Sequence, residues 1–491
     1  MVKAVVGEET QLNLAEDRLF QSEVPAQVGL VVGKLSSGLD RGFVFDLILT
    51  PPNDSGAPAC SVPESGKDDK KKGSKGKSQV EPSSLLIDID WVAEHARQVS
   101  RMLLGGMNVV GIYVWATESL FKASNVIIWQ TVKEVAEAAP FYESKVDERL
   151  LIHISYSPRR WICRNCTVGS SITSSSLRPC DFKMGRVLSS LQTFKCMYNF
   201  EIRLPIFHDS PSNVGTFREV LCNRILQHAK ELGGAKALIN GNLVVEDEPC
   251  TTDGSHDVEL LLPFIKDAPI EASSQKEVAG IVIFTGSICS FAYLSPKEPI
   301  SQAIADIKGD IIMSLQSRLD IICDEAEDVT HSAIDDSEEA SNEISTERPI
   351  PQHILQLLRK PCKLSFPRRV LIPWVASAFI CDYLQPSDTF EVLKEHCKEL
   401  MSMEAPTDTS SILEPETEAT SLTTKSFWDA VLTRYSTSGS DYDSVRKMES
   451  DSAGKEINRE SFKLTNFNFV AALVIVLLSI LVGLVLPIFK A

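Results

Sequence analysis

Residues 103–115 read Leu-Leu-Gly-Gly-Met-Asn-Val-Val-Gly-Ile-Tyr-Val-Trp, and this stretch joins a predicted helix to a predicted strand. Upstream, apolar residues recur at helical spacing after Asp88 or Asp90 as the N-cap, and the two glycines of the stretch supply the stop. The β-branched and aromatic residues of 109–115 predict a buried strand. A helix followed at once by a buried strand indicates a mixed fold of the α/β or α+β class.

Two further strands are predicted before this helix, at residues 28–33 and 43–49. From Pro51 to Ser84 the chain consists largely of Pro, Gly, Ser and Lys and has almost nothing to bury. We therefore predict a first domain over residues 1–149, interrupted by a disordered insertion at 51–84.

A second α/β domain is predicted over residues 150–323. A capping box, Thr216-x-x-Glu219, precedes one amphipathic helix, and apolar residues at intervals of three and four predict a long helix from Ile304 to Ile322. The strands predicted in this domain cover residues 236–239, 258–262, 278–284 and 290–294.

The next part of the chain alternates between charged and apolar segments. Residues 324–349 contain ten acidic residues and one arginine, which predicts an acidic linker. Residues 350–403 predict a small segment of strands and one helix, begun by an Asp388-x-x-Glu391 box, that docks on the preceding domain. Residues 404–465 are rich in Ser and Thr and predict a disordered tether.

Residues 466–491 form the predicted membrane anchor. From Phe469 to Phe489 the sequence carries no charge, and a helix of this length crosses about 30 Å of bilayer core. A buried core helix is the alternative, but such helices normally carry a polar stripe and this one has only Ser479. The residues that we assign to the membrane anchor along this span are Phe469, Leu473, Leu477, Leu481, Leu484 and Phe489.

The position of this span predicts the topology of the chain. Only Lys490 and Ala491 follow it, and no signal sequence opens the chain. We therefore expect a tail anchor inserted after synthesis, with the bulk of the chain in the cytosol.

Charge and cysteine content exclude several classes of protein. The chain has 49 basic and 66 acidic residues and a net charge of −17, so nucleic acid is not an expected partner. Most of this charge lies in the predicted linker and tether, which leaves the predicted domains close to neutral. Twelve cysteines in 491 residues are too few for a disulfide scaffold.

Four cysteines are weak candidates for a metal site. Cys163 and Cys166 have the C-x-x-C spacing of metal ligands, and Cys180 and Cys196 are possible further thiolates. A structural zinc site normally closes with a second C-x-x-C or a His pair, so ordinary thiols are the favoured interpretation and a redox C-x-x-C is a further alternative. His95, on the apolar side of its helix, is expected to be a hydrogen-bonded core residue. The sequence contains no complete phosphate-loop, nucleophile-elbow or H-E-x-x-H motif.

Several short motifs in a fixed order resemble the odorant-response-abnormal-four-like family. They are residues 103–113, Pro179 with Asp181, the Pro-Arg-Arg-Val of 367–370, Cys381-Asp382-Tyr383, and the single C-terminal apolar span. The resemblance covers nearly the whole chain apart from the predicted insertion and tether. The loops rich in Ser, Arg and Lys look like those of a plant member.

Members of that family are similar in their N-terminal part to the MPN (JAB) fold, whose active versions bind zinc and cleave isopeptide bonds. Active versions carry His-x-His-Pro directly after the strand that here begins at Val109. Here the corresponding residues are Tyr113, Val114, Trp115 and Ala116, which include no metal ligand. The resemblance thus implies an MPN-like domain without zinc ligands, with no catalytic residues and no cofactor.

The resemblance also implies a function and its partners. It implies a non-enzymatic, tail-anchored adaptor of the endoplasmic reticulum membrane, whose partner is the cysteine protease that processes the ubiquitin-fold modifier. The alternative is a chaperone or trafficking factor for a subset of membrane receptors of the G-protein-coupled type, acting through its membrane segment. A metal-dependent isopeptidase is a third hypothesis.

We expect the partner interface of such an adaptor on the helix before residue 103. Its apolar face comprises Trp91, Val92, Val99, Met102 and Leu103. The alternative is that these side chains only pack against the sheet of their own domain.

Overall fold

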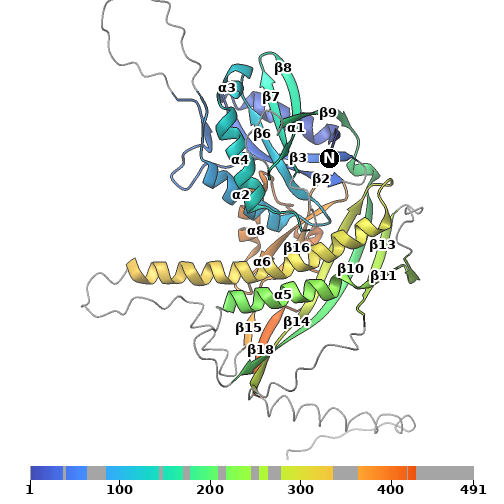
Figure 1. Ribbon diagram of the computed structural model, residues 1–491. Helices are drawn as coiled ribbons and strands as arrows, with labels where there is room; N and C mark the ends of the chain where they lie inside the picture. The colour runs from blue at the N-terminus through green and yellow to red at the C-terminus, as the bar shows by residue number, and fades with distance from the viewer. Residues whose placement is uncertain are drawn as a thin grey trace, which may run out of the picture. The chain divides into compact units, whose positions relative to one another are not determined.

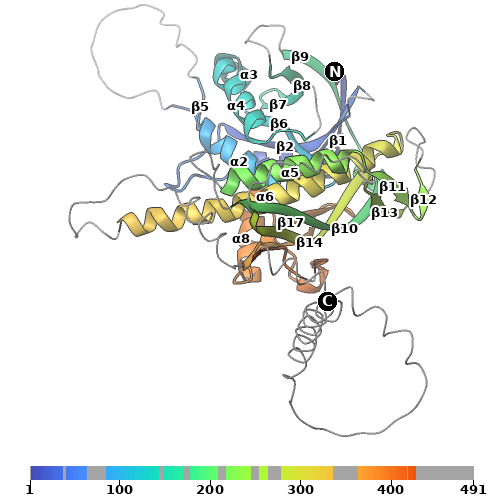
Figure 2. The ribbon, with the colours of Figure 1, turned by 60° about the horizontal axis from the view of Figure 1, so that its bottom comes forward.

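Two seven-stranded sheets organise the part of the chain that the structure describes (Figures 1 and 2). The first sheet closes into a barrel and the second stays open. In this computed structural model, one compact unit covers Met1–Val431. The structure describes residues 2–36, 40–63, 84–142, 148–169, 177–207, 217–244, 254–263, 278–335, 363–416 and 418–426.

The barrel has the strand order β1-β3-β2-β6-β7-β8-β9 and closes because β1 pairs in parallel with both β3 and β9. Its strands are β1 (Ala4–Glu8), β2 (Gln27–Ser36), β3 (Arg41–Leu49), β6 (Asn108–Trp115), β7 (Glu148–Tyr156), β8 (Arg159–Thr167) and β9 (Leu177–Gly185). The strand predicted at 109–115 is thus confirmed as β6, which pairs with β2 and β7 at the centre of the order. Its side chains alternate between two apolar clusters, Ile112 and Val114 in one, Tyr113 and Trp115 in the other.

Helices cover the two faces of this sheet. Helix α1 (Glu9–Gln21) buries Leu12, Ala15 and Leu19 in one apolar cluster, together with Tyr113 and Trp115. Helices α2 (Ile89–Met102) and α4 (Asn125–Ala138) lie side by side on the other face, with the short α3 (Glu118–Ala123) before α4 (Figure 1). The helix predicted from the apolar spacing is confirmed as α2, and Asp88 caps it by accepting from Trp91 N.

The second sheet has the order β12-β11-β13-β10-β14-β18-β15. Its strands are β10 (Gln192–Phe207), β11 (Lys236–Ile239), β12 (Asn242–Leu243), β13 (Ser255–Leu261), β14 (Val278–Leu294), β15 (Lys363–Ser365) and β18 (Ser421–Ser426). The long strands β10 and β14 pair antiparallel, so the two runs predicted at 278–284 and 290–294 form one continuous strand. Helices α5 (Phe217–Gly233) and α6 (Ile300–Asp335) lie together over one face (Figures 1 and 2).

A C-terminal hairpin packs into the core of the barrel half. Its strands β16 (Arg368–Pro373) and β17 (Phe379–Leu384) are followed by helix α8 (Phe390–Met401). Val370, Ile380 and Leu393 share one apolar cluster with residues of α2, α4 and β6. The described part of this segment consists of strands and a helix, as predicted, but it packs against the barrel half as well as against β14 of the predicted second domain. The N-cap of α8 is Thr389, not Asp388, whose carboxylate accepts from Gln385 N.

The structure corrects several boundaries predicted from the sequence. The barrel continues through β9, so the two sheets divide between Gly185 and Gln192 rather than at residue 149. The predicted insertion at 51–84 is ordered at its start, where β4 (Cys60–Ser61) pairs with β5 (Leu86–Ile87). Residues 64–83 lie outside the described residues.

The first part of each predicted linker contains secondary structure. Helix α6 continues to Asp335, into the predicted acidic linker 324–349. The predicted tether 404–465 contributes a short 3-10 helix at Thr409–Ser411, a buried Glu416 and strand β18. The start of the predicted tether adds a strand to the second sheet and a buried partner for Arg318 of α6, contacts that local composition does not reveal. The remainder of both segments lies outside the described residues.

The described helices include none that is long and apolar enough to cross a membrane. The predicted anchor 466–491, including its apolar residues from Phe469 to Phe489, lies outside the described residues. Thr216 of the first predicted capping box also lies outside them. The mixed α/β class is confirmed; the MPN-like character of the barrel stays a prediction.

Candidate functional site

Helix α6 has two buried faces of opposite character. Its apolar face packs on the second sheet through Ala303, Ile307, Ile311, Leu315, Leu319 and Ile322. The opposite face carries Asp306, Asp310, Ser314 and Arg318, spaced four residues apart; the last three are buried and Asp306 is partly buried. Residues four apart lie on one side of a helix, so these polar side chains form a single stripe. The stripe faces the barrel and the C-terminal hairpin, and we call its contacts the buried junction.

The first contact of the buried junction ties α6 to the barrel. Lys34 of β2 is buried, and its Nζ lies 2.6 Å from Asp306 Oδ2 and 3.5 Å from Glu298 Oε2. The same Nζ donates to Tyr293 O at 3.0 Å. Burial opposes the charge of Lys34, but the two carboxylates outweigh it and hold its pKa above the ordinary value.

The second contact ties α6 to the hairpin. Arg369 of β16 makes a bidentate pair with Asp310, at 2.8 Å and 2.7 Å. Arg318 Nη2 donates to both carboxylate oxygens of Glu416, at 2.6 Å each. Glu416 also accepts from Arg369 N at 3.0 Å, and Arg318 Nε donates to Pro367 O at 3.0 Å. The planar fork between Arg369 and Asp310 fixes geometry as well as charge.

A glycine turn lets the barrel approach the second sheet closely. Gly105 and Gly106 have φ values of +71° and +79°, which favour glycine. Gly105 O accepts from Tyr293 N at 3.2 Å. A Cβ on Gly105 would lie 2.4 Å from the Tyr293 ring, and a Cβ on Gly106 would lie 2.4 Å from Asp306 Oδ2. The glycine pair is therefore required by the junction, not only by the end of α2.

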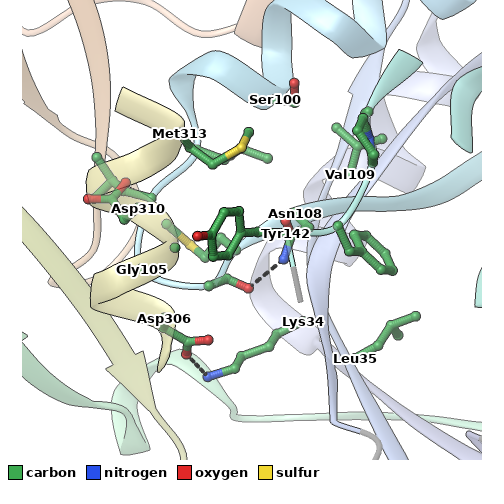
Figure 3. A pocket seen from close by; sticks show the side chains of 18 of the residues that line it. Lys34, Leu35, Ser100, Gly105, Asn108, Val109, Tyr142, Asp306, Asp310 and Met313 are labelled. Atoms are coloured by element: carbon green, nitrogen blue, oxygen red, sulfur yellow. Dashed lines mark hydrogen bonds and ion pairs between the residues drawn. The ribbon is translucent and has the colours of Figure 1, made fainter. Parts of the chain in front are cut away.

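A cavity of about 240 Å³ lies beside the buried junction (Figure 3). Its lining includes Lys34, Asn108, Tyr142, Asp306 and Met313. The volume lies below the roughly 300 to 1,000 Å³ of ordinary small-molecule sites. The Lys34 and Asp306 side chains at its edge point toward each other in Figure 3 and neutralise one another. This arrangement suits a rigid joint between the two sheets better than a catalytic centre.

A second set of charges on α6 lies at the surface, and we call it the exposed network. Asp324 contacts Arg97 at 3.2 Å and Arg101 at 3.1 Å, both on α2. Asp320 contacts Arg218 of α5 at 2.6 Å. All of these side chains except the largely buried Arg101 keep about a third or more of their surface in water, so the pairs of Arg97 and Arg218 are each worth about 0 to 1 kcal/mol.

The structure does not bring the four candidate metal-binding cysteines together, although two of them are neighbours. Cys163 and Cys166 lie on β8 three residues apart, and strand alternation sends them into different apolar clusters on opposite faces. Cys180 lies on β9 opposite Cys163. Cys196 lies in the core of the second sheet. Within the described residues, no group of three or more His, Cys, Asp or Glu side chains could hold a metal ion.

The predicted partner interface on α2 is wrong for four of its five residues. Val92, Val99, Met102 and Leu103 are buried, and Trp91 is partly buried. The reason is non-local: β17 and α8, far along the chain, cover this face of α2 together with α4. These side chains pack inside the fold, as in the alternative, but against the C-terminal hairpin and α8 as well as against their own domain.

His95 is a hydrogen-bonded core residue, as expected. Its Nε2 lies 2.9 Å from Leu400 O and its Nδ1 lies 3.2 Å from Thr50 Oγ1. Burial lowers its pKa to about 4, so the ring is neutral at physiological pH.

Sequence reasoning missed the charged residues of the buried junction. They are Lys34, Glu298, Asp306, Asp310, Arg318, Arg369 and Glu416. One signal was present, because polar residues recur every four positions on α6 opposite its apolar face. Another was that Gly105-Gly106, Arg369 and Cys381-Asp382-Tyr383 belong to the motifs quoted above. In the structure two of these motifs contact each other, because the Arg369 guanidinium lies 5.7 Å from the centre of the Tyr383 ring. Cys381 Sγ donates to Arg101 O, next to the motif that contains the glycine pair.

The matches to known proteins cover most of the chain, including the residues of the buried junction up to residue 412. The sequence pattern of the odorant response abnormal 4-like family matches residues 29–412. The human protein named Protein odr-4 homolog is 25% identical over an alignment of 398 positions that covers 76% of this chain and 77% of that protein. The Dictyostelium discoideum protein of the same name is 23% identical over an alignment of 421 positions that covers 82% of this chain and 81% of that protein. A crystal structure of UfSP from C. elegans matches 82% of this chain and 57% of that chain at 7% identity and a TM-score of 0.36, too weak to support an argument.

Proposed function

Because the chain belongs to the odorant response abnormal 4-like family, we propose that it is a non-enzymatic adaptor anchored in the membrane of the endoplasmic reticulum. In this role it holds the cysteine protease of the ubiquitin-fold-modifier pathway at the membrane. Tethering a soluble enzyme to a surface raises its local concentration there without any new catalytic contact.

The observation that carries this proposal is the end of strand β6. Active MPN enzymes place two His ligands here, and a catalytic zinc needs three protein ligands and an open position for water. In this chain Tyr113, Val114, Trp115 and Ala116 fill the positions, and all four are buried in the core. Burial raises the pKa of the Tyr113 hydroxyl, so it stays protonated. These residues supply neither ligands nor an opening.

The buried junction gives the proposal further support. Ion pairs that connect the barrel, α6 and the hairpin hold these parts in one arrangement. A fixed surface suits a binding protein, because little conformational entropy is then lost when a partner binds.

The test is recruitment of the protease to membranes. Full-length chain, a chain lacking 466–491, and a chain in which 466–491 is replaced by an unrelated apolar span would each be expressed with the tagged protease. We expect the deletion variant to bind the protease in solution but to leave it off membranes, and the replacement to restore membrane recruitment. Failure of the full-length chain to bind the protease would refute the proposal.

A trafficking factor for membrane receptors is the second candidate. The observation that favours it is the uncharged stretch Phe469–Phe489, whose single polar side chain is Ser479. If this stretch contacts client helices directly, the unrelated replacement span should keep the chain on membranes yet lose receptor delivery to the cell surface. If delivery is kept, the stretch acts as an anchor alone.

A further inference from the structure

Two cysteines face each other on neighbouring strands of the barrel. In the antiparallel pairing of β8 with β9, Cys163 lies directly opposite Cys180. Directly opposite residues have Cα atoms about 4.5 to 5.5 Å apart and side chains on the same face. Disulfides need Cα atoms about 4.4 to 6.8 Å apart. The register therefore places these two thiols where a bond between them is sterically allowed.

The two thiols differ in exposure and in acidity. Cys163 is buried in the apolar cluster under α1, and Cys180 is only partly buried. The hydrogen bond from Cys163 lowers the pKa of Cys180, while the same contact and burial raise the pKa of Cys163. Cys180 is thus the thiol that solvent reaches and that ionises first.

The other cysteines of this region lack such a geometry. Cys166 lies on the opposite face of β8, although its spacing from Cys163 had suggested a pair. Cys196 and Cys289 lie on neighbouring strands of the second sheet but belong to the clusters on its two different faces. Burial raises the pKa of Cys196 to about 12 and that of Cys289 to about 11.

Strand β9 is the one that closes the barrel. It pairs with β8 on one side and with β1 on the other, and Asp181 N donates to Lys3 O at 3.0 Å. Cys180 Sγ itself donates to Val2 O at 3.3 Å. A covalent link from β8 to β9 would therefore fix the strand that holds the N-terminal segment.

We propose that Cys163 and Cys180 form a redox pair that a hydroperoxide oxidises to a disulfide between β8 and β9. The Cys180 thiolate attacks one peroxide oxygen, the O–O bond breaks, and the products are a Cys180 sulfenic acid and, after protonation, water or an alcohol. The Cys163 sulfur then attacks the Cys180 sulfur, the S–O bond breaks, and the leaving hydroxide takes the Cys163 proton and departs as water as the S–S bond forms. Two electrons from the two thiols reduce one peroxide, and a dithiol reductant reverses the reaction.

The experiment uses the full-length chain in detergent. The reduced chain is treated with hydrogen peroxide, its remaining thiols are blocked, and its disulfide-linked peptides are mapped by mass spectrometry. We expect a peptide pair that joins Cys163 to Cys180, the loss of two thiols from the chain's twelve, and recovery of both with dithiothreitol. Cys166→Ser is the matched control, because it removes a cysteine of the same strand and should leave the linked pair unchanged.

Two further variants test the order of the steps. In Cys163→Ser, the Cys180 sulfenic acid has no partner and should be trapped by dimedone. In Cys180→Ser, dimedone should not label Cys163. A dominant link through Cys166, no link in the oxidised wild-type chain, or equal labelling of Cys163 and Cys180 would overturn the proposal.

Discussion

Helix α6 carries both the buried junction and the exposed network, and the two differ in what a lost partner would cost. In the junction, Asp310 and its partner Arg369 are both withdrawn from water. In the network, Asp324 and its partner Arg97 remain about one third exposed. Removing one member of a buried pair strands a charge that water cannot reach, whereas a surface partner simply rehydrates. Two ion pairs of similar nitrogen–oxygen distance on one helix therefore differ greatly in the free energy that the loss of one partner would cost.

The largest expected effect is from Asp310→Asn. The change leaves Arg369 buried without its bidentate carboxylate, and such losses cost about 3 to 5 kcal/mol. Urea unfolding of the purified full-length chain, followed by tryptophan fluorescence, measures the free energy of unfolding. Since the junction joins the sheets, we expect the loss to affect the whole transition.

A double replacement separates charge burial from simple damage. In Asp310→Leu combined with Arg369→Met both charges are absent, so most of the lost stability should return. If the double variant is as unstable as Asp310→Asn, packing rather than the stranded charge explains the loss, and the contrast between junction and network fails.

The next effect concerns acid. His95 has a folded-state pKa of about 4 against about 6.5 in an unfolded chain, so the unfolded state binds its proton first. Its contribution is complete above about pH 6.5 and is lost as the pH falls towards 4, a change of roughly 3 kcal/mol. The free energy of unfolding, measured from pH 7 to pH 4, should fall less steeply in His95→Gln.

His396 provides the matched histidine control. It is partly exposed, and its hydrogen bond to Asp382 raises its pKa. Its contribution has the opposite sign: it is present below pH 6.5 and is lost as the pH rises through the raised value. His396→Gln should therefore leave the acid-side slope that His95 controls unchanged. An equal slope in the wild-type chain and His95→Gln would show that burial of His95 does not control acid stability.

A third effect tests the close approach at the glycine turn. Gly106→Ala places a Cβ against Asp306 at a φ of +79°, so it strains the backbone and displaces the carboxylate that pairs with Lys34. We expect a loss of about 2 kcal/mol in the same urea experiment. Gly56→Ala is the control, because Gly56 has the same φ and no atom within 4 Å of its added Cβ. Equal losses of unfolding free energy in both variants would mean that the contact with Asp306 does not contribute to the effect of Gly106→Ala.

The smallest effect is expected in the exposed network. Asp324→Asn should cost less than about 1 kcal/mol, and the cost should shrink further in 1 M salt, where the Debye length is about 3 Å. The loss in Asp310→Asn should be far less sensitive to salt. A large, salt-insensitive loss in Asp324→Asn would place the network in the same class as the junction.

Local sequence patterns predicted many elements correctly. The spacing of apolar residues located α2 and the central part of α6, and β-branched runs located β6 and β11. The boundaries failed where an element depends on a distant partner. Strand β18 is short and polar, and it forms because β14 and β15 offer it hydrogen bonds.

The candidate site was largely invisible for the same reason. Lys34 and Asp306 are separated by 272 residues, Arg318 and Glu416 by 98, and Arg369 and Asp310 by 59. A lone Lys or Glu in a sequence is most simply a surface residue. Nothing local to Lys34 or Glu416 signals that it is buried with an opposite charge.

The sequence by itself determined the class of fold and the family, because residue type and short-range spacing carry that information. Only the tertiary structure decided which surfaces stay open and which side chains meet. It buried the α2 face under a hairpin from the far end of the chain, and it paired Cys163 with Cys180 instead of Cys166. Strand register and packing partners are set by contacts between distant segments, and such contacts leave little trace in any short stretch of sequence.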